Sequence, residues 1–223
     1  MEERVEPLLT RVADATDRLL GTVGRLSDDD CRVASRLPGW SRGHVLSHLA
    51  RNADALAGLM DGARTGRSVP TYASAEARDA DIEADATRPA AELLADLRAV
   101  STVFAEAATR LGPALDRDEW SVEQEWRHGR SRPTSDVPVA RLAEVELHHV
   151  DLGAGYGLAH LPDPVAELLI DDALSPGSAS RATSPRSRCG WKAAVLPCPP
   201  STTERSARTP SRSQVAAPTC SAG

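Results

Sequence analysis

Apolar residues recur every three or four positions through most of the first 175 residues, which is typical of amphipathic helices packed around a core. Residues 5–26 show this most clearly, with Val and Leu side chains along a single face. The same spacing predicts further helices over residues 42–63, 74–86, 89–111, 136–153 and 163–174. No segment alternates convincingly as a strand would, and residues 116–136 are predicted to be a loop.

Local signals predict where these helices begin and end. Ser27 and the aspartates after it end the first helix and can cap a short second one. Ser41 is a suitable N-cap for the next helix, which is expected to close near Gly66. Four long helices most simply form a four-helix bundle, so the predicted fold class is all-α. The residues of the 89–111 helix expected to face inward are Leu93, Leu94, Leu97, Val100, Val103 and Phe104.

The chain changes character near residue 175. From Pro176 to Gly223 it is rich in Ser, Thr and Pro, and it carries seven basic residues against one acidic residue. Such a segment has too little periodic apolar surface to offset the entropy cost of ordering it, so it is predicted to be disordered. Two origins stay open: a natural flexible tail, or a shift of reading frame, because GC-rich DNA encodes Arg, Ser, Pro, Cys and Trp out of frame.

The composition narrows the range of partners. A net charge of −6 gives no global electrostatic support for binding nucleic acid. No apolar stretch is long enough to span a membrane, and the N-terminus is acidic where a signal peptide is basic. Only Cys31 lies in the helical part, and the four cysteines do not suggest disulfides. We therefore expect a cytoplasmic protein, a monomer or weak dimer, that binds neither nucleic acid nor membrane.

Two of the predicted helices carry residue types that bind metals. His44 and His48 are four residues apart on the 42–63 helix and share a face, as do Glu144 and His148 on the 136–153 helix. Two imidazoles and one carboxylate are what a catalytic zinc takes from a protein, with a fourth position left for substrate. The set can bind a metal only if the two helices face each other.

Taken singly, these residues say little. A histidine on an amphipathic helix is more often a structural or surface residue than a ligand, and Glu and His are common on solvated faces. His149 is rotated by about 100° from His148 around the helix and is not expected to be a ligand. Asp151 lies three residues beyond His148, and its role, like that of His44, is left open.

Three tracts add what spacing cannot: LPGWSRGHVLSHLARNADAL (37–56), TYASAEARDADIEADATRP (71–89) and EVELHHVDLGAGY (144–156). In order and spacing they resemble the mycothiol-dependent maleylpyruvate isomerase family over about residues 5–174. The resemblance implies a DinB-like four-helix bundle that binds zinc or another divalent metal. Its metal ligands would be His48, Glu144 and His148.

The resemblance also implies a chemistry and a cofactor. Mycothiol would supply a metal-activated thiolate that adds reversibly to the cis double bond of maleylpyruvate, and rotation and elimination would then give fumarylpyruvate. Because the substrate is a dicarboxylate, a cationic side chain is needed near the metal. Arg78 matches the family's position for that catalytic group, although a solvated helix arginine is an equally reasonable interpretation.

The C-terminal part departs from the family. Members continue into a small α/β domain that supplies a further arginine, and residues 176–223 show none of that pattern. We therefore expect the bundle over residues 1–158, the start of the second domain over 159–175, and the tail over 176–223. Two other functions stay open: a mycothiol S-transferase acting on electrophiles, or a non-enzymatic metal-binding bundle with a frame-shifted C-terminus.

Overall fold

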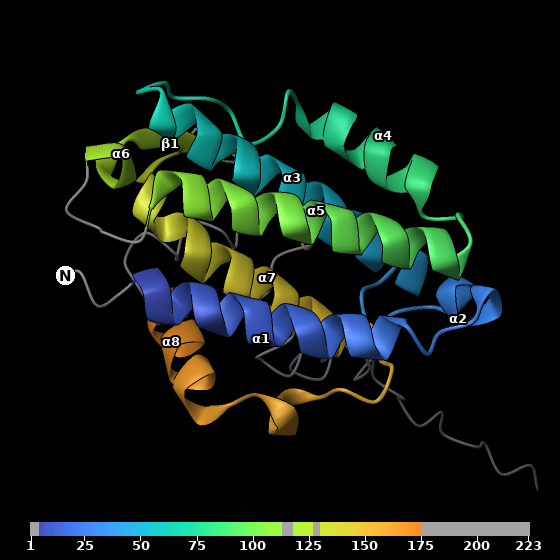
Figure 1. Ribbon diagram of the computed structural model, residues 1–223. Helices are drawn as coiled ribbons and strands as arrows, with labels where there is room; N and C mark the ends of the chain where they lie inside the picture. Colours follow the sequence, from blue (N-terminus) through green and yellow to red (C-terminus); the bar gives the residue numbers. More distant parts are fainter. Residues whose placement is uncertain (1–4, 113–117, 127–129, 175–223) are drawn as a thin grey trace, which may run out of the picture.

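The computed structural model describes residues 5–112, 118–126 and 130–174. Four long helices form the bundle: α1 (Val5–Val23), α3 (Arg42–Arg64), α5 (Ala90–Leu111) and α7 (Val137–Asp151) (Figure 1). In the ring of contacts, α3 packs between α5 and α7, and α1 closes the ring between the same two helices. The predicted all-α four-helix bundle is therefore confirmed. The predicted tail, residues 176–223, lies outside the described residues.

Capping side chains fix the starts of the helices. Ser27 caps α2 (Asp28–Arg32), and Ser41 caps α3, in both cases through a capping box with the residue three positions on. Ser74 caps α4 (Ala75–Asp85). The helix α5 has no side-chain cap of its own at Pro89, and the backbone N–H of Ala90 instead donates to Asp28 Oδ1 at 2.7 Å. The predicted starts are thus correct to within one residue.

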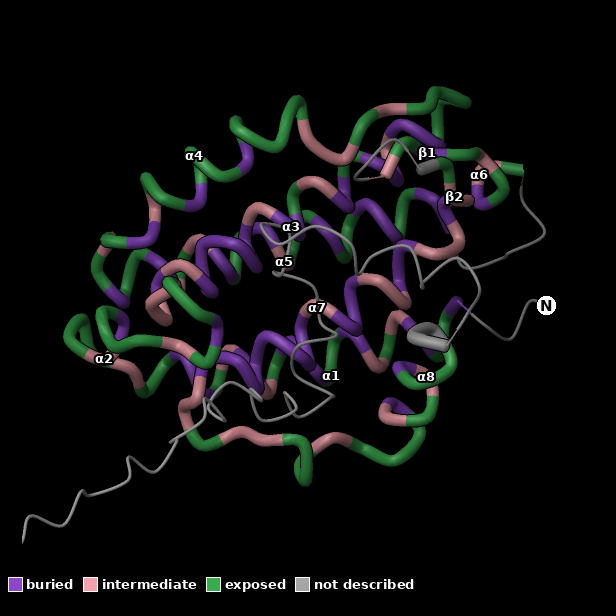
Figure 2. Tube along the Cα trace, turned by 180° about the vertical axis from the view of Figure 1, so that it is seen from behind, coloured by how far each residue is buried: buried purple, intermediate pink, exposed green. Residues whose placement is uncertain are grey.

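The core runs along the middle of the bundle, where the inward faces of the long helices are buried (Figure 2). The helix α4 covers the outside of α3, and only Arg78 and Ile82 of its residues are buried. A Cβ at Gly43 would collide with the carbonyl of Ala86, so glycine here allows the chain after α4 to lie directly on α3. This close approach helps to bring Arg78 to the buried face of α3.

The segment predicted to be a loop contains regular structure, so that prediction was wrong. It forms α6 (Asp118–Ser121) and an antiparallel pair of strands, β1 (Glu123–Trp126) and β2 (Arg130–Pro133), before the 3-10 turn η3 (Thr134–Asp136). The inward side chain of β1 is Gln124, which bonds to the backbone N–H of Val69 and the carbonyl of Arg67. A strand whose buried residue is polar gives no apolar alternation. Trp120 of this segment is buried.

Two further differences concern exposure and the region after α7. Val103 was predicted to face inward but is 42% exposed, because it lies at the edge of the apolar face of α5. After α7 the chain forms η4 (Leu158–His160) and α8 (Asp163–Leu174), whose Val165 and Leu169 join the core. The boundary drawn at residue 158 stays a prediction. No helix of the described ranges is long and apolar enough to cross a membrane.

Candidate metal centre

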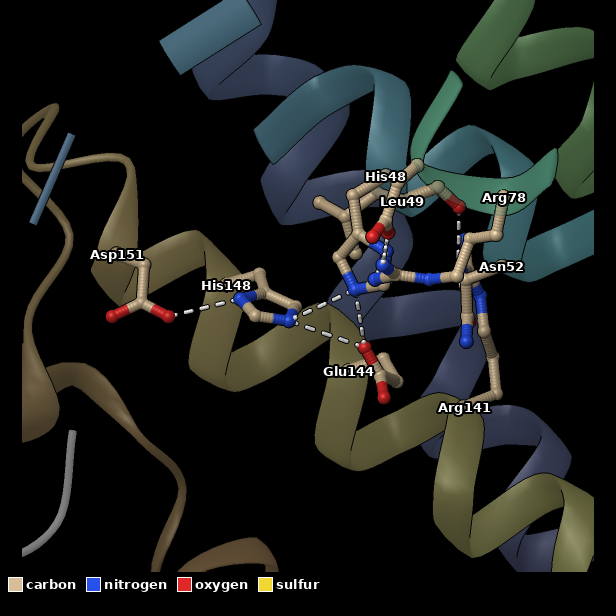
Figure 3. A network of polar contacts seen from close by, with 9 residues as sticks. His48, Leu49, Asn52, Arg78, Arg141, Glu144, His148 and Asp151 are labelled. Carbon is tan, nitrogen blue, oxygen red and sulfur yellow. Dashed lines mark hydrogen bonds and ion pairs between the residues drawn. The ribbon is translucent and has the colours of Figure 1, made fainter. Parts of the chain in front are cut away.

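The residues singled out on the two helices meet in the bundle interior. His48 of α3 and His148 of α7 place their Nε2 atoms 3.1 Å apart, and Glu144 Oε2 lies 2.9 Å from the first and 3.2 Å from the second (Figure 3). The two histidines are buried, whereas the Glu144 side chain is 31% exposed. The three donor atoms therefore form a triangle in which only the carboxylate belongs to a partly exposed side chain.

This donor set fits a tetrahedral metal ion. Zinc bound at about 2.0–2.1 Å by nitrogen and oxygen places its ligand atoms about 3.3 Å apart, close to the separations in the triangle. Within the described residues, the three side chains are the only group of three or more His, Cys, Asp or Glu with donor atoms close enough to share an ion. Three protein ligands leave the fourth position to a small molecule.

His148 is oriented by a neighbouring carboxylate. Its Nδ1 lies 2.9 Å from Asp151 Oδ2, one turn further along α7, and both side chains are buried. Burial disfavours the charged ring, but the hydrogen bonds and charges of Asp151 and Glu144 outweigh it and raise the pKa of His148 to about 9. Because Nδ1–H donates to Asp151, Nε2 points to the centre of the triangle, where it would offer a lone pair to a metal ion once its own proton is lost.

His48 has a cation for a neighbour instead. Arg78 Nη2 of α4 lies 3.0 Å from His48 Nδ1, and Arg78 Nη1 donates to Asp79 Oδ1 at 2.6 Å. Burial lowers the pKa of His48 to about 4, against the attraction of Glu144. Burial also opposes ionisation of Glu144, but hydrogen bonds from His148 and His48 hold the pKa of its carboxyl well below the ordinary value. The structure thus brings Arg78 to the ligand set.

The remaining histidines of the two helices have other partners. His44 completes the capping box at Ser41, stacks on Trp40 and reaches Glu83 of α4 at 3.1 Å. His149 lies on another face of α7, toward α1, where its Nε2 is 2.8 Å from Thr22 Oγ1. The prediction that His149 would not join the ligands agrees with this placement.

Sequence reasoning missed three residues that contact His48 or link the two helices carrying the triangle. Trp40 meets the His48 ring edge-on at 5.7 Å between centroids. Arg42 and Arg141 each bond across from one ligand helix to the other. Arg141 stands three residues before Glu144 on the same helical face, a spacing that could have pointed to it. Nothing in the sequence singles out Trp40 or Arg42.

Comparisons with known proteins give a consistent relationship. The family model described as mycothiol maleylpyruvate isomerase N-terminal domain matches residues 12–153. A crystal structure of mycothiol-dependent maleylpyruvate isomerase is 30% identical, with a TM-score of 0.70 over 75% of this chain and 68% of that chain. A histidine-to-alanine mutant of the same enzyme gives 29% identity and the same TM-score and coverage. No curated protein sequence matches significantly. The family resemblance and the DinB-like bundle are confirmed.

Proposed function

The chain belongs to the mycothiol maleylpyruvate isomerase N-terminal domain family, and on this premise we propose a zinc- and mycothiol-dependent cis–trans isomerase of the maleylpyruvate type. The observation that carries the proposal is the convergence of His48 Nε2, His148 Nε2 and Glu144 Oε2 within hydrogen-bond distance of one another. These three residues would hold the ion. Zinc supplies one thing here: it lowers the pKa of a bound thiol enough to make a thiolate near neutral pH.

The protein's own groups then have separate tasks. Asp151 keeps the lone pair of His148 directed at the ion by accepting its Nδ1–H. Arg78, buried beside His48, provides a positive charge for the carboxylates of the substrate and for the negative charge that develops when a thiol adds to the conjugated double bond. The thiolate would form a bond to one carbon of the double bond and would leave again when that bond breaks. The two steps cancel, so no net oxidation or reduction occurs and the thiol is regenerated.

The thiol is expected to come from outside the chain. Cys31, the one cysteine of the described residues, is buried in α2, and burial raises the pKa of its thiol. A buried thiol with a raised pKa is a poor nucleophile. A Cys31→Ser variant should therefore retain full activity with mycothiol, and it serves as a matched control for an internal nucleophile.

The decisive experiment measures conversion of maleylpyruvate to fumarylpyruvate by the purified, zinc-loaded full chain, with and without mycothiol. Turnover that requires both zinc and mycothiol supports the proposal. A zinc-loaded protein that joins mycothiol to an uncharged electrophile but leaves maleylpyruvate unchanged would instead indicate S-transfer, which needs the same ligands but no carboxylate-binding arginine. A chain that binds no zinc at all would contradict both functions.

A further inference from the structure

Two arginine side chains connect the ligand-bearing helices α3 and α7. Arg141 of α7 donates from Nη1 to the backbone carbonyl of Leu49 at 2.9 Å and to Asn52 Oδ1 at 2.8 Å, both on α3 (Figure 3). Its side chain is only 1% exposed. Leu49 follows His48 directly in the chain, and Asn52 lies one turn beyond it.

The second connection runs in the other direction. Arg42, the first residue of α3, donates from Nε to the carbonyl of Leu152 at 2.8 Å and from Nη2 to the carbonyl of Gly153 at 2.9 Å. These carbonyls belong to the C-cap of α7 and the residue after it, at the end of the helix that favours a cation. Each helix therefore sends one arginine to the backbone of the other.

The metal ligands lie between these two connections on both helices. On α3, His48 stands between Arg42 and Asn52, and on α7, Glu144 and His148 stand between Arg141 and Leu152. Bonds to backbone carbonyls on both sides of the ligands oppose sliding and rotation of one helix against the other. Since a working site tolerates displacements of only about 0.5 Å, such restraint bears directly on metal binding.

Stability alone gives a poor account of Arg141. Among the described residues, Glu144 and Asp54 attract its guanidinium but form no ion pair with it, and one of its terminal nitrogens, Nη2, is buried without a hydrogen-bond partner there. Burying a charge without a counter-charge is costly, and an apolar side chain of similar size is often as stable or more so. What a well-packed apolar residue could not supply is a pair of directed hydrogen bonds to α3.

We infer that Arg42 and Arg141 are positioning residues that hold α3 and α7 in the register needed for His48, Glu144 and His148 to share one metal ion. This rests on the proposed metal site and deepens it. Neither arginine needs to touch the substrate. The expected consequence of losing either one is weaker and less regular metal binding in a protein that is still folded.

The test compares Arg141→Met and Arg42→Gln with the parent, using Arg110→Met as the matched control. Arg110 also bridges two bundle helices, α5 and α3, through Asp61, but it is exposed and no described contact links it to the ligands. Zinc affinity is measured by competition with a chelator, well below the unfolding midpoint of each variant. The visible spectrum of the cobalt-substituted protein reports the ligand geometry.

We expect zinc binding to weaken by about 10- to 100-fold in Arg141→Met and by less in Arg42→Gln, as for other residues that orient ligands indirectly. The cobalt bands should change in both variants and stay as in the parent in Arg110→Met. Arg141→Lys, which keeps the charge but not the forked donor, should lie between Arg141→Met and the parent. If Arg141→Met does not fold, Arg141→Lys and Arg42→Gln are the variants that test the inference.

Parent-like affinity and cobalt spectra in folded Arg141 and Arg42 variants would overturn the inference while leaving the proposed zinc site intact. An equal loss in Arg110→Met would overturn it too, because any bridge between bundle helices would then have the same effect. A parent chain that binds neither zinc nor cobalt overturns the proposed function and this inference together. Measuring metal binding by the parent first distinguishes a failure of the proposed zinc site from a failure of the inference about the arginines.

Discussion

His48 and His148 offer the same ring nitrogen to the same point, yet their outer nitrogens face opposite charges. Nδ1 of His148 faces the carboxylate of Asp151 at 2.9 Å, and Nδ1 of His48 faces the guanidinium of Arg78 at 3.0 Å. Both rings are buried, but burial lowers the pKa of His48 to about 4, whereas the two carboxylates raise that of His148 to about 9. Two neighbouring histidines of one cluster thus have opposite electrostatic surroundings.

The difference has a consequence for metal binding. A guanidinium only donates, so its contact with His48 uses the lone pair of Nδ1 and leaves the ring proton on Nε2. A metal ion needs the Nε2 lone pair, which moves the proton to Nδ1 and sets two donors against each other. If the cluster holds a metal ion, His148 needs only to lose its Nε2 proton while Nδ1–H stays on Asp151, whereas on α3 Arg78 would have to move away from Nδ1 of His48. Nη2 of Arg78 would then be available to an anionic substrate, while Nη1 stays paired with Asp79.

The largest expected effect comes from removing either of the two histidines, one on α3 and one on α7. His48→Ala and His148→Ala should each lose stoichiometric zinc, because two remaining ligands hold the ion far more weakly than three. Metal analysis after dialysis against a zinc-buffered solution measures this. His160→Ala removes an exposed histidine of η4 and should keep its zinc. Full zinc content in either ligand variant would show that the triangle is not the metal site.

A second prediction concerns His148 alone, through the carboxylate of Asp151 that it contacts. Asp151→Ala should weaken zinc binding by about 10- to 100-fold, because His148 loses the acceptor that fixes its tautomer and ring orientation. The affinity is measured by chelator competition. Asp163→Ala, at the exposed start of α8, is the control and should bind zinc as the parent does. Parent-like affinity in Asp151→Ala would mean that the carboxylate is not needed to orient His148.

The sequence went far toward both the fold and the cluster of His48, Glu144 and His148, for a physical reason. Side chains spaced for a helix must share a face, so the 3.6-residue period placed His48 on one helix and Glu144 with His148 on another. Ser27, Ser41 and Ser74 cap helices through contacts that span three residues, and such local contacts can be predicted from order alone.

What the sequence did not predict depends on contacts between distant segments. The β1–β2 pair has a buried glutamine satisfied by backbone groups more than fifty residues away, so its alternation is invisible in hydrophobicity. The bonds from Arg42 to the end of α7 cross more than a hundred positions, and an arginine on an amphipathic helix normally faces solvent. The meeting of α3 and α7 itself came from family resemblance, since spacing within each helix cannot say which helices are neighbours.

A smaller effect on zinc binding is expected from changing Arg78, the cation that contacts His48 of α3. Arg78→Gln should bind zinc as tightly as the parent or up to about tenfold more tightly, because the donor that opposes the metal-binding tautomer of His48 is weakened. The same variant should turn over a dicarboxylate poorly, since it lacks the cation. Arg98→Gln, an exposed change on α5, is the control. Weaker zinc binding in Arg78→Gln would show that the guanidinium supports the ion and would remove the contrast between the two histidines.

The last prediction extends the comparison to a third buried histidine. His149 neighbours His148 in the chain, but its partner is the hydroxyl of Thr22 rather than a carboxylate, and its Nδ1 has no partner among the described residues. Burial, with Arg18 and Arg25 nearby, lowers the pKa of His149 to about 4. If a neighbouring carboxylate is what raises the pKa of His148, then His149, which has none, should resist protonation in the folded protein.

The sign of its effect on stability follows from linkage. The unfolded chain takes up a proton on this residue below its ordinary pKa of about 6.5, whereas the folded chain does so only below about 4. Stability is therefore lost as the pH falls between these values, by up to about 3 kcal/mol from this one group. Urea unfolding of the parent and of His149→Gln at several pH values measures it. The free energy of unfolding should fall less steeply in the variant, and parallel curves would mean that Thr22 accommodates a protonated ring after all.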